Sequence, residues 1–234
     1  MDARTLHLLT APPFALLVSL ATPNSVAFFI QSIVSMTEVW IIGSLGTASL
    51  AAIALAFTLL MLMQTLPGGA LGGSVASSIA RALGAGNHER AERLIWHALA
   101  IAAISAALVL LLFTFGGEGL FRFLGGSDTV LEQATSYGRI LCSGGLFLWL
   151  IGVLTAVFRG MGDMRFPAMM MVTNAIIQVP VSICLVVGAF GLPKLGVSGA
   201  AVSAVLVSAL ISLIMLLRLS FGNTLIKLRL HTQL

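Results

Sequence analysis

Charged side chains are scarce in this sequence. Of its 234 residues, 9% are Asp, Glu, Lys or Arg and 59% are hydrophobic, whereas a soluble domain carries about 25% charged and about 45–50% apolar residues. Twelve basic and eight acidic side chains are too few to cover a globule of this length with a hydrated surface. The composition therefore predicts an integral membrane protein, embedded in the lipid bilayer.

Other absences exclude further classes. The two cysteines, Cys142 and Cys184, lie inside apolar runs, so they form neither a disulfide framework nor a metal-ligand spacing. The basic residues are scattered singly rather than clustered, which excludes a nucleic-acid partner. No nucleophile with a base, metal cluster or phosphate loop stands out, so we expect neither an enzyme nor a bound cofactor or metal.

Six long stretches lack Asp, Glu, Lys and Arg altogether, at residues 5–37, 39–80, 94–117, 140–158, 166–193 and 195–217. A helix needs about 20 apolar residues to cross the hydrocarbon, and the small residues 43–47 mark a turn between the first two stretches. The sequence thus predicts an all-α bundle over 14–220, between a cytoplasmic segment 1–13 and a cytoplasmic tail 221–234. The six predicted helices lie near 14–42, 48–80, 90–114, 129–158, 164–188 and 196–219.

The basic residues are distributed unevenly around these helices. Most fall on one side of the predicted bundle, whereas Arg122 and Lys194 fall in the loops of the opposite side. Short cytoplasmic loops are enriched in Lys and Arg. We therefore expect a multi-pass protein of the plasma (inner) membrane with both termini in the cytoplasm. The residues on the cytoplasmic side are Arg4, Arg81, Arg90, Arg93, Arg159, Arg165, Arg218, Lys227 and Arg229.

Glu38 is the acidic residue that interrupts the apolar sequence of the first helix. A charge inside the bilayer costs about 3 kcal/mol by insertion scales, so a residue of this kind usually has a function. We interpret Glu38 as a protonatable or cation-binding carboxylate that faces a water-filled cavity. The alternative is that it lies close enough to the helix end to reach headgroup water.

Asn174 and Gln178 are a second polar feature, four residues apart and therefore on one face of the fifth helix. They either line the same cavity as Glu38 or form hydrogen bonds between helices. Pro180 follows, and a proline inside a membrane helix frees a carbonyl and favours a kink, so we expect a hinge there.

Two further patterns have structural interpretations. The segment 68–74 (GGALGGS) has glycines four residues apart, which is typical of close helix packing rather than phosphate binding. The methionines at 61, 63 and 169–171 are predicted to face lipid or fill the core, and the alternative is that these flexible side chains adapt to varied ligands.

Several segments together resemble one transporter family. They are 43–46 (GSLG) with 50–52 (LAA), 81–93 (RALGAGNHERAER), 158–167 (FRGMGDMRFP), Asn174 and 192–201 (LPKLGVSGAA). In this order and spacing, from about residue 10 to 220, they resemble the MATE (multidrug and toxic compound extrusion) family. The resemblance implies an antiporter that exports organic cations and other amphipathic small molecules in exchange for H+ or Na+.

The resemblance also implies roles for the polar residues. Glu38 occupies the place of the coupling-ion carboxylate of the first helix, which is more commonly Asp. Asn174 matches an asparagine of the fifth helix, and Gln178 stands where one bacterial branch has Asp. The coupling mechanism of that branch therefore does not transfer directly, because Gln178 does not titrate.

The chain matches one lobe of a family whose members have twelve helices in two lobes. The chain is therefore expected to be a truncated form, one part of a split transporter or a half that forms a homodimer, and a second lobe is an expected partner, either as a second copy of this chain or as a separate chain. Two other functions remain open. One is a membrane scaffold or remnant that does not transport. The other is a flippase for lipid-linked precursors, which would need a strongly cationic cavity, whereas the predicted helices have almost no Lys or Arg.

Overall fold

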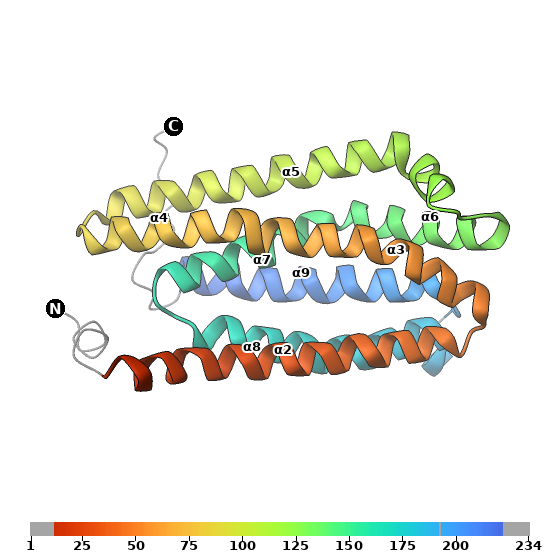
Figure 1. Cartoon of the computed structure of the whole chain (residues 1–234), viewed down its shortest axis with the longest axis horizontal. Coiled ribbons are helices and arrows are strands. Elements are labelled where there is room, and N and C mark those ends of the chain that lie inside the picture. Colours follow the sequence, from red (N-terminus) through yellow and green to blue (C-terminus); the bar gives the residue numbers. More distant parts are fainter. Residues whose placement is uncertain (1–11, 192, 222–234) are drawn as a thin grey trace.

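The computed structural model describes residues 12–191 and 193–221, and its regular elements over these ranges are all helical (Figure 1). The predicted all-α membrane bundle is thereby confirmed. The helices are α2 (Pro13–Gly43), α3 (Thr47–Thr65), η1 (Leu66–Leu71), α4 (Gly72–Gly84), α5 (His88–Phe123), α6 (Asp128–Ser143), α7 (Gly145–Gly160), α8 (Arg165–Val187), η2 (Ala189–Gly191) and α9 (Val197–Phe221).

The long helices run along one common direction (Figure 1). Helix α2 packs on α8, α8 on α9, α4 on α7 and α5 on α6. The start of α2, the α4–α5 turn and the end of α9 all lie at the left-hand end in Figure 1. In the described part of the chain, five helical rods are long and apolar enough to span a membrane, and α6 with α7 forms a sixth, bent by 54°.

The second spanning rod, Thr47–Gly84, is not a uniform α-helix. It contains the π-helical segment η1, Leu66–Leu71, between α3 and α4. Pro67 lies in the first turn of η1 and has no amide hydrogen to donate, so the regular α-helical ladder cannot continue through it. Segments of this kind are rare and occur frequently at functional sites.

The helix predicted near 129–158 is broken at Gly144. A Cβ atom at that position would lie 2.8 Å from Cβ of Val205 in α9. The glycine therefore allows α9 to approach the break closely, and this contact with a distant part of the chain explains why an apolar run alone did not predict it.

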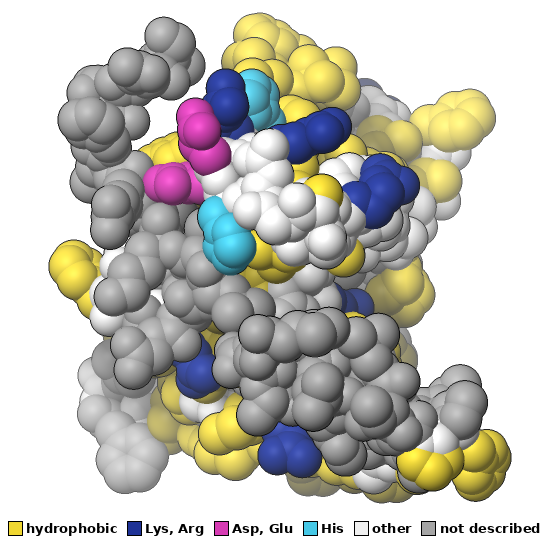
Figure 2. Space-filling view, turned by 90° about the vertical axis from the view of Figure 1, so that its left-hand side faces the viewer, with side chains coloured by type: hydrophobic (Ala, Val, Ile, Leu, Met, Phe, Trp, Pro, Cys, Tyr) yellow, Lys and Arg dark blue, Asp and Glu magenta, His cyan; other side chains and the backbone are white. Residues whose placement is uncertain are grey.

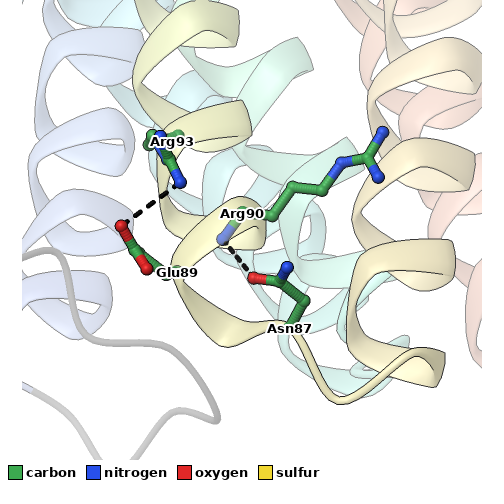
Figure 3. Close-up of polar contacts among 4 residues, drawn as sticks. All are labelled: Asn87, Glu89, Arg90 and Arg93. Atoms are coloured by element: carbon green, nitrogen blue, oxygen red, sulfur yellow. Dashed lines mark hydrogen bonds and ion pairs between the residues drawn. The ribbon is translucent and has the colours of Figure 1, made fainter.

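Helix α5 begins with a cap that Figure 3 shows in detail. The side-chain oxygen of Asn87 accepts a hydrogen bond from the backbone N–H of Arg90 at 2.9 Å, and Arg93 pairs with Glu89 at 3.2 Å. The helix was predicted to end near residue 114 but continues to Phe123. Its last turns include an ion pair between Glu118 and Arg122 at 3.0 Å, which stabilises helix beyond the apolar run.

The core is built from small residues that let the helices approach closely. Completely buried alanines line the contacts between rods, including Ala52, Ala91 and Ala102. At Gly160 of α7, an added Cβ would lie 2.8 Å from the carbonyl oxygen of Ala76 in α4. Small residues at such contacts are typical of membrane helices, where van der Waals packing drives association.

One end of the bundle carries several charged side chains among the described residues. Figure 2 shows the end that holds the α4–α5 turn, where Lys or Arg side chains gather with a few acidic and histidine side chains, and hydrophobic side chains surround them. This pattern suits an end that emerges from the bilayer into water.

Candidate functional site

Glu38 and Gln178 come together between α2 and α8. The Nε2 of Gln178 donates a hydrogen bond to Oε1 of Glu38 at 2.8 Å, across a separation of 140 residues. Gln178 is buried. The carboxylate therefore has a specific hydrogen-bond partner on another helix.

One more side chain joins this pair. The Nε2 of Gln178 also lies 3.4 Å from Oγ of Ser203 in α9, whose hydroxyl donates to the carbonyl of Ala200 at 2.8 Å. We refer to Glu38, Gln178 and Ser203 as the Glu38 cluster. Three helices, α2, α8 and α9, thus meet at one polar position inside the bundle.

A cavity of about 490 Å³ lies beside the cluster. We call it the lobe cavity, and the residues that line it come from α2, α3, η1, α7, α8 and α9. They are Phe28, Gln31, Met61, Gln64, Thr65, Pro67, Gly68, Gly69, Leu148, Ile151, Gly152, Thr155, Arg159, Pro167, Met170, Met171, Asn174, Ser208, Ile211 and Met215.

The lining residues of each helix recur at helical spacing. Residues 148, 151, 152, 155 and 159 follow one face of α7, and residues 167, 170, 171 and 174 follow one face of α8. Positions three and four apart lie above one another on a helix. Continuous faces of several helices therefore line the cavity, which is not a local packing defect.

The composition of this wall bears on two sequence-based expectations. Met63 is buried, as predicted for a core residue, whereas Met61, Met170 and Met171 line the cavity, which is the position that the alternative of ligand contact requires. Arg159 was assigned to the cytoplasmic loops because it follows an apolar run. The structure places it in the last turn of α7, within the cavity wall.

The polar residues predicted for one shared cavity occupy two adjacent sites. Asn174 lines the lobe cavity, whereas Gln178, one turn or about 6 Å further along α8, binds Glu38. None of the Glu38 cluster is among the described residues that line the cavity. Pro180 lies inside α8, which continues to Val187, and its role as a hinge stays a prediction.

The glycine-rich segment has two roles. Gly72 packs closely, since its added Cβ would lie 3.3 Å from Cβ of Ala156 in α7, but no atom lies within 4 Å of such a Cβ at Gly68 or Gly73. Gly68 instead lines the cavity. On the facing helix, a Cβ at Gly152 would lie 2.8 Å from Cβ of Pro67. Glycine at 152 therefore allows η1 to lie directly against α7.

Comparison with known proteins identifies the family of this bundle. The sequence profile described as MatE matches residues 23–184, which is more than half of the chain and includes both Glu38 and Gln178. The chain belongs to the MATE family. The MATE profile spans the helices that contribute most of the lobe cavity, from α2 to α8.

Individual MATE relatives agree with this assignment. The chain is 31% identical over 196 residues to a protein named "FAD transporter" from Shewanella oneidensis, a match that covers 84% of this chain and 43% of the relative. It is 25% identical over 191 residues to "Probable multidrug resistance protein NorM" from Thermotoga maritima, covering 81% and 41%. Both relatives are thus named for transport or for drug resistance.

The fold matches one lobe of a solved MATE structure. A MOP superfamily transporter from Pyrococcus furiosus superimposes with a TM-score of 0.88 and 26% identity, covering 98% of this chain and 50% of that one. The chain therefore spans about half the length of the relatives and structures that it matches. It has the architecture of a single lobe of a MATE transporter.

Proposed function

We propose that this chain forms one lobe of an ion-driven exporter of amphipathic small molecules. The observation that carries this proposal is the hydrogen bond of 2.8 Å between Gln178 and Glu38, inside a membrane bundle and one turn from Asn174 in the cavity wall. A buried carboxylate near a ligand-sized cavity is the arrangement that ion-coupled transport needs. The names of the relatives, which refer to multidrug resistance and to FAD transport, support the same class of function.

In the proposed mechanism, Glu38 alternates between an ion-bound state and an empty state, with H+ or Na+ as the ion. The amide of Gln178 stabilises the charged carboxylate by donating to it, and this bond weakens when a proton or cation takes the same oxygen. Gln31 and Asn174 belong to the same two helices, α2 and α8, and line the cavity. A change at the α2–α8 contact therefore alters the cavity wall directly. Glu38 acts here with neutral amides and needs no further cofactor.

A second lobe completes the proposed transport path. Family members arrange two lobes with the path between them, and repeats of six helices begin on the same side of the membrane. A second copy of this chain or a separate chain supplies that lobe. The lipid bilayer and amphipathic or cationic small molecules are the other proposed partners.

We place the charged end of the bundle (Figure 2) in the cytoplasm of a cell with this protein in its plasma (inner) membrane. Single cysteines at Asn87 and Lys194, in a chain without Cys142 and Cys184, should react with impermeant reagents from opposite sides. Labelling of both from the outside would contradict this orientation.

The decisive experiment changes the carboxylate alone. Glu38→Gln keeps the shape and hydrogen bonding but removes the titratable charge, so export driven by a H+ or Na+ gradient should be abolished while membrane insertion is retained. Glu38→Asp is the matched variant and should keep measurable export. The assay is ion-driven dye efflux, and drug resistance, in cells stripped of their own efflux pumps.

Two outcomes would contradict the proposal. Equal ion-driven export by Glu38→Gln and the parent would make Glu38 an interfacial residue without a coupling role. Absence of ion-driven efflux from the parent, with a second lobe present, would favour a scaffold that does not transport.

A further inference from the structure

We propose that the lobe cavity binds planar aromatic lactams, and that Gln31 and Asn174 recognise the edge of the ring at which an N–H donor lies next to a carbonyl acceptor. Recognition of this kind rests on the proposed function, since the transported molecule has to bind in the lobe cavity. It names the chemical group that the cavity selects, which the broad class of amphipathic small molecules leaves open.

Gln31 and Asn174 lie at neighbouring levels of the bundle, because α2 and α8 pack side by side and run in the same direction (Figure 1). The hydrogen bond between Glu38 and Gln178 fixes the register of these two helices. Gln31 precedes Glu38 by seven residues, two turns, and so lies on the same face of α2. Asn174 precedes Gln178 by four residues on α8. At a rise of 1.5 Å per residue, the two amides lie about 10 Å and about 6 Å before that bond, so their levels differ by about 4–5 Å.

Both amides are available to a ligand. Gln31 and Asn174 line the cavity, and neither side chain is hydrogen-bonded to another residue in the described part of the chain. A primary amide carries a carbonyl acceptor beside an N–H donor. A lactam edge carries the complementary donor and acceptor at a similar spacing, so the two groups form a pair of parallel hydrogen bonds, as Asn and Gln do with the edge of adenine.

The remainder of the wall favours a flat apolar body on the same molecule. Four methionines line the cavity together with Phe28, and their flexible thioether chains adapt to aromatic surfaces. A ligand whose polar edge only accepts hydrogen bonds would leave an amide oxygen of the wall facing an acceptor in a partly dehydrated site, which is costly. A planar aromatic lactam satisfies the donor and the acceptor together. The methionines are Met61, Met170, Met171 and Met215.

Two neutral fluorescent dyes of nearly the same shape test the inference. The lactam 7-amino-4-methyl-2-quinolone has a ring N–H where 7-amino-4-methylcoumarin has a ring oxygen. Binding of each dye to the purified chain in zwitterionic nanodiscs is measured by fluorescence anisotropy, and empty nanodiscs give the contribution of lipid. The parent should bind the quinolone about tenfold or more tighter than the coumarin, because the coumarin leaves a hydrogen-bonding group of the wall unpaired. Both dyes are neutral, so the charge of Arg159, which also lines the cavity, acts on both alike.

Matched variants make the result specific. Gln31→Leu and Asn174→Leu each remove one amide at similar volume, so each should weaken quinolone binding and reduce its preference over the coumarin, and the double variant should bind the two dyes within about threefold of each other. Gln133→Leu makes the same kind of change in α6, at a position that does not line the cavity, and should keep the preference of the parent. Circular dichroism and elution volume confirm that each variant is folded.

Three results would overturn the inference. Equal binding of the two dyes by the parent, or tighter binding of the coumarin, would show that the cavity does not select the lactam edge. A preference that survives in the double variant, or that Gln133→Leu loses equally, would remove the role of Gln31 and Asn174. Binding of neither dye by the parent would rule out planar lactams as ligands of the cavity. All three leave the coupling proposal for Glu38 intact, which the Glu38→Gln efflux experiment tests separately.

Discussion

The Glu38 cluster and the lobe cavity lie near each other but differ in size and in the side chains that form them. In the cluster, Gln178 and Ser203 are buried and the central contact is a direct hydrogen bond of 2.8 Å, so a ligand there could be little larger than an ion. The cavity has a volume of about 490 Å³ and a wall of methionines, amides and one arginine among the described residues. One site is suited to a small ion and the other to a larger and less defined molecule.

The same comparison shows where the two sites are linked. Helix α2 contributes Glu38 to the cluster and Gln31, two turns earlier, to the cavity. Helix α8 contributes Gln178 to the cluster and Asn174, one turn earlier, to the cavity. The sites share helices but no side chain in the described lining. A substitution in one site should therefore affect that site more strongly than the other, and such variants test whether the two sites are separate.

Among the residues around Glu38, the largest effect is expected from Gln178→Leu. This change removes the amide that donates to Glu38 and leaves a buried carboxylate without that donor. A hydrogen bond to a charged group contributes about 1.5–3 kcal/mol, so ion-driven efflux should fall about tenfold or more. Dye binding in the lobe cavity, measured on the purified chain, should change much less than efflux does, because Gln178 does not itself line the cavity.

The matched control is Asn174→Leu, one turn away on the same helix. Because Asn174 lines the cavity and not the cluster, its removal should weaken dye binding but leave the dependence of the remaining efflux on H+ or Na+ unchanged. If both variants lost binding and coupling equally, the cluster and the cavity would be one site.

The sequence predicted part of the cluster and missed the rest for a physical reason. Glu38 and Gln178 stood out because strongly polar groups are costly in lipid. Ser203 did not stand out, since a serine in a membrane helix bonds to its own backbone, as the contact with Ala200 shows. Arg159 was counted with the loops because a charge at the end of an apolar run cannot be assigned to a cavity without the neighbouring helices.

The sequence likewise predicted some features of the fold and missed others. Apolar runs predicted the number and order of the spanning helices, because hydrophobic length is a local property. The break at Gly144 and the π-helical segment η1 depend instead on partners far along the chain, namely Val205 for Gly144 and Gly152 for Pro67. Pro67, followed by two glycines, was the available signal that the second helix would be irregular.

Gly152→Ala is expected to have the next largest effect and tests how rigidly the cavity wall is fixed. The new methyl group would lie 2.8 Å from Cβ of Pro67 and 3.1 Å from the backbone nitrogen of Gly68. Since η1 cannot move without α3 and α4, the substitution should destabilise the lobe by about 1–3 kcal/mol. It should also weaken dye binding, because both contacting residues line the cavity.

Thermal unfolding in detergent measures this change, with Gly73→Ala as its control. No atom lies within 4 Å of a Cβ at Gly73, and alanine favours helix over glycine by about 1 kcal/mol, so the control should be as stable as the parent or more stable. An equal loss of stability in both variants would mean that the close contact between α7 and η1 is not what limits substitution.

The smallest effect is expected from Ser203→Ala, which probes the edge of the Glu38 cluster. Its Oγ lies 3.4 Å from Nε2 of Gln178, a long contact, so its loss should weaken coupling by about 0.5–1 kcal/mol, or about two- to fivefold in the apparent affinity for the ion. Ser212→Ala is a close control on the same helix, because the Ser212 hydroxyl makes the same kind of bond to its own backbone, at 3.0 Å to Ala209. Ion titrations of efflux should separate the two variants: a similar shift in both would show that Ser203 acts only through α9 packing, and the cluster would then end at Gln178.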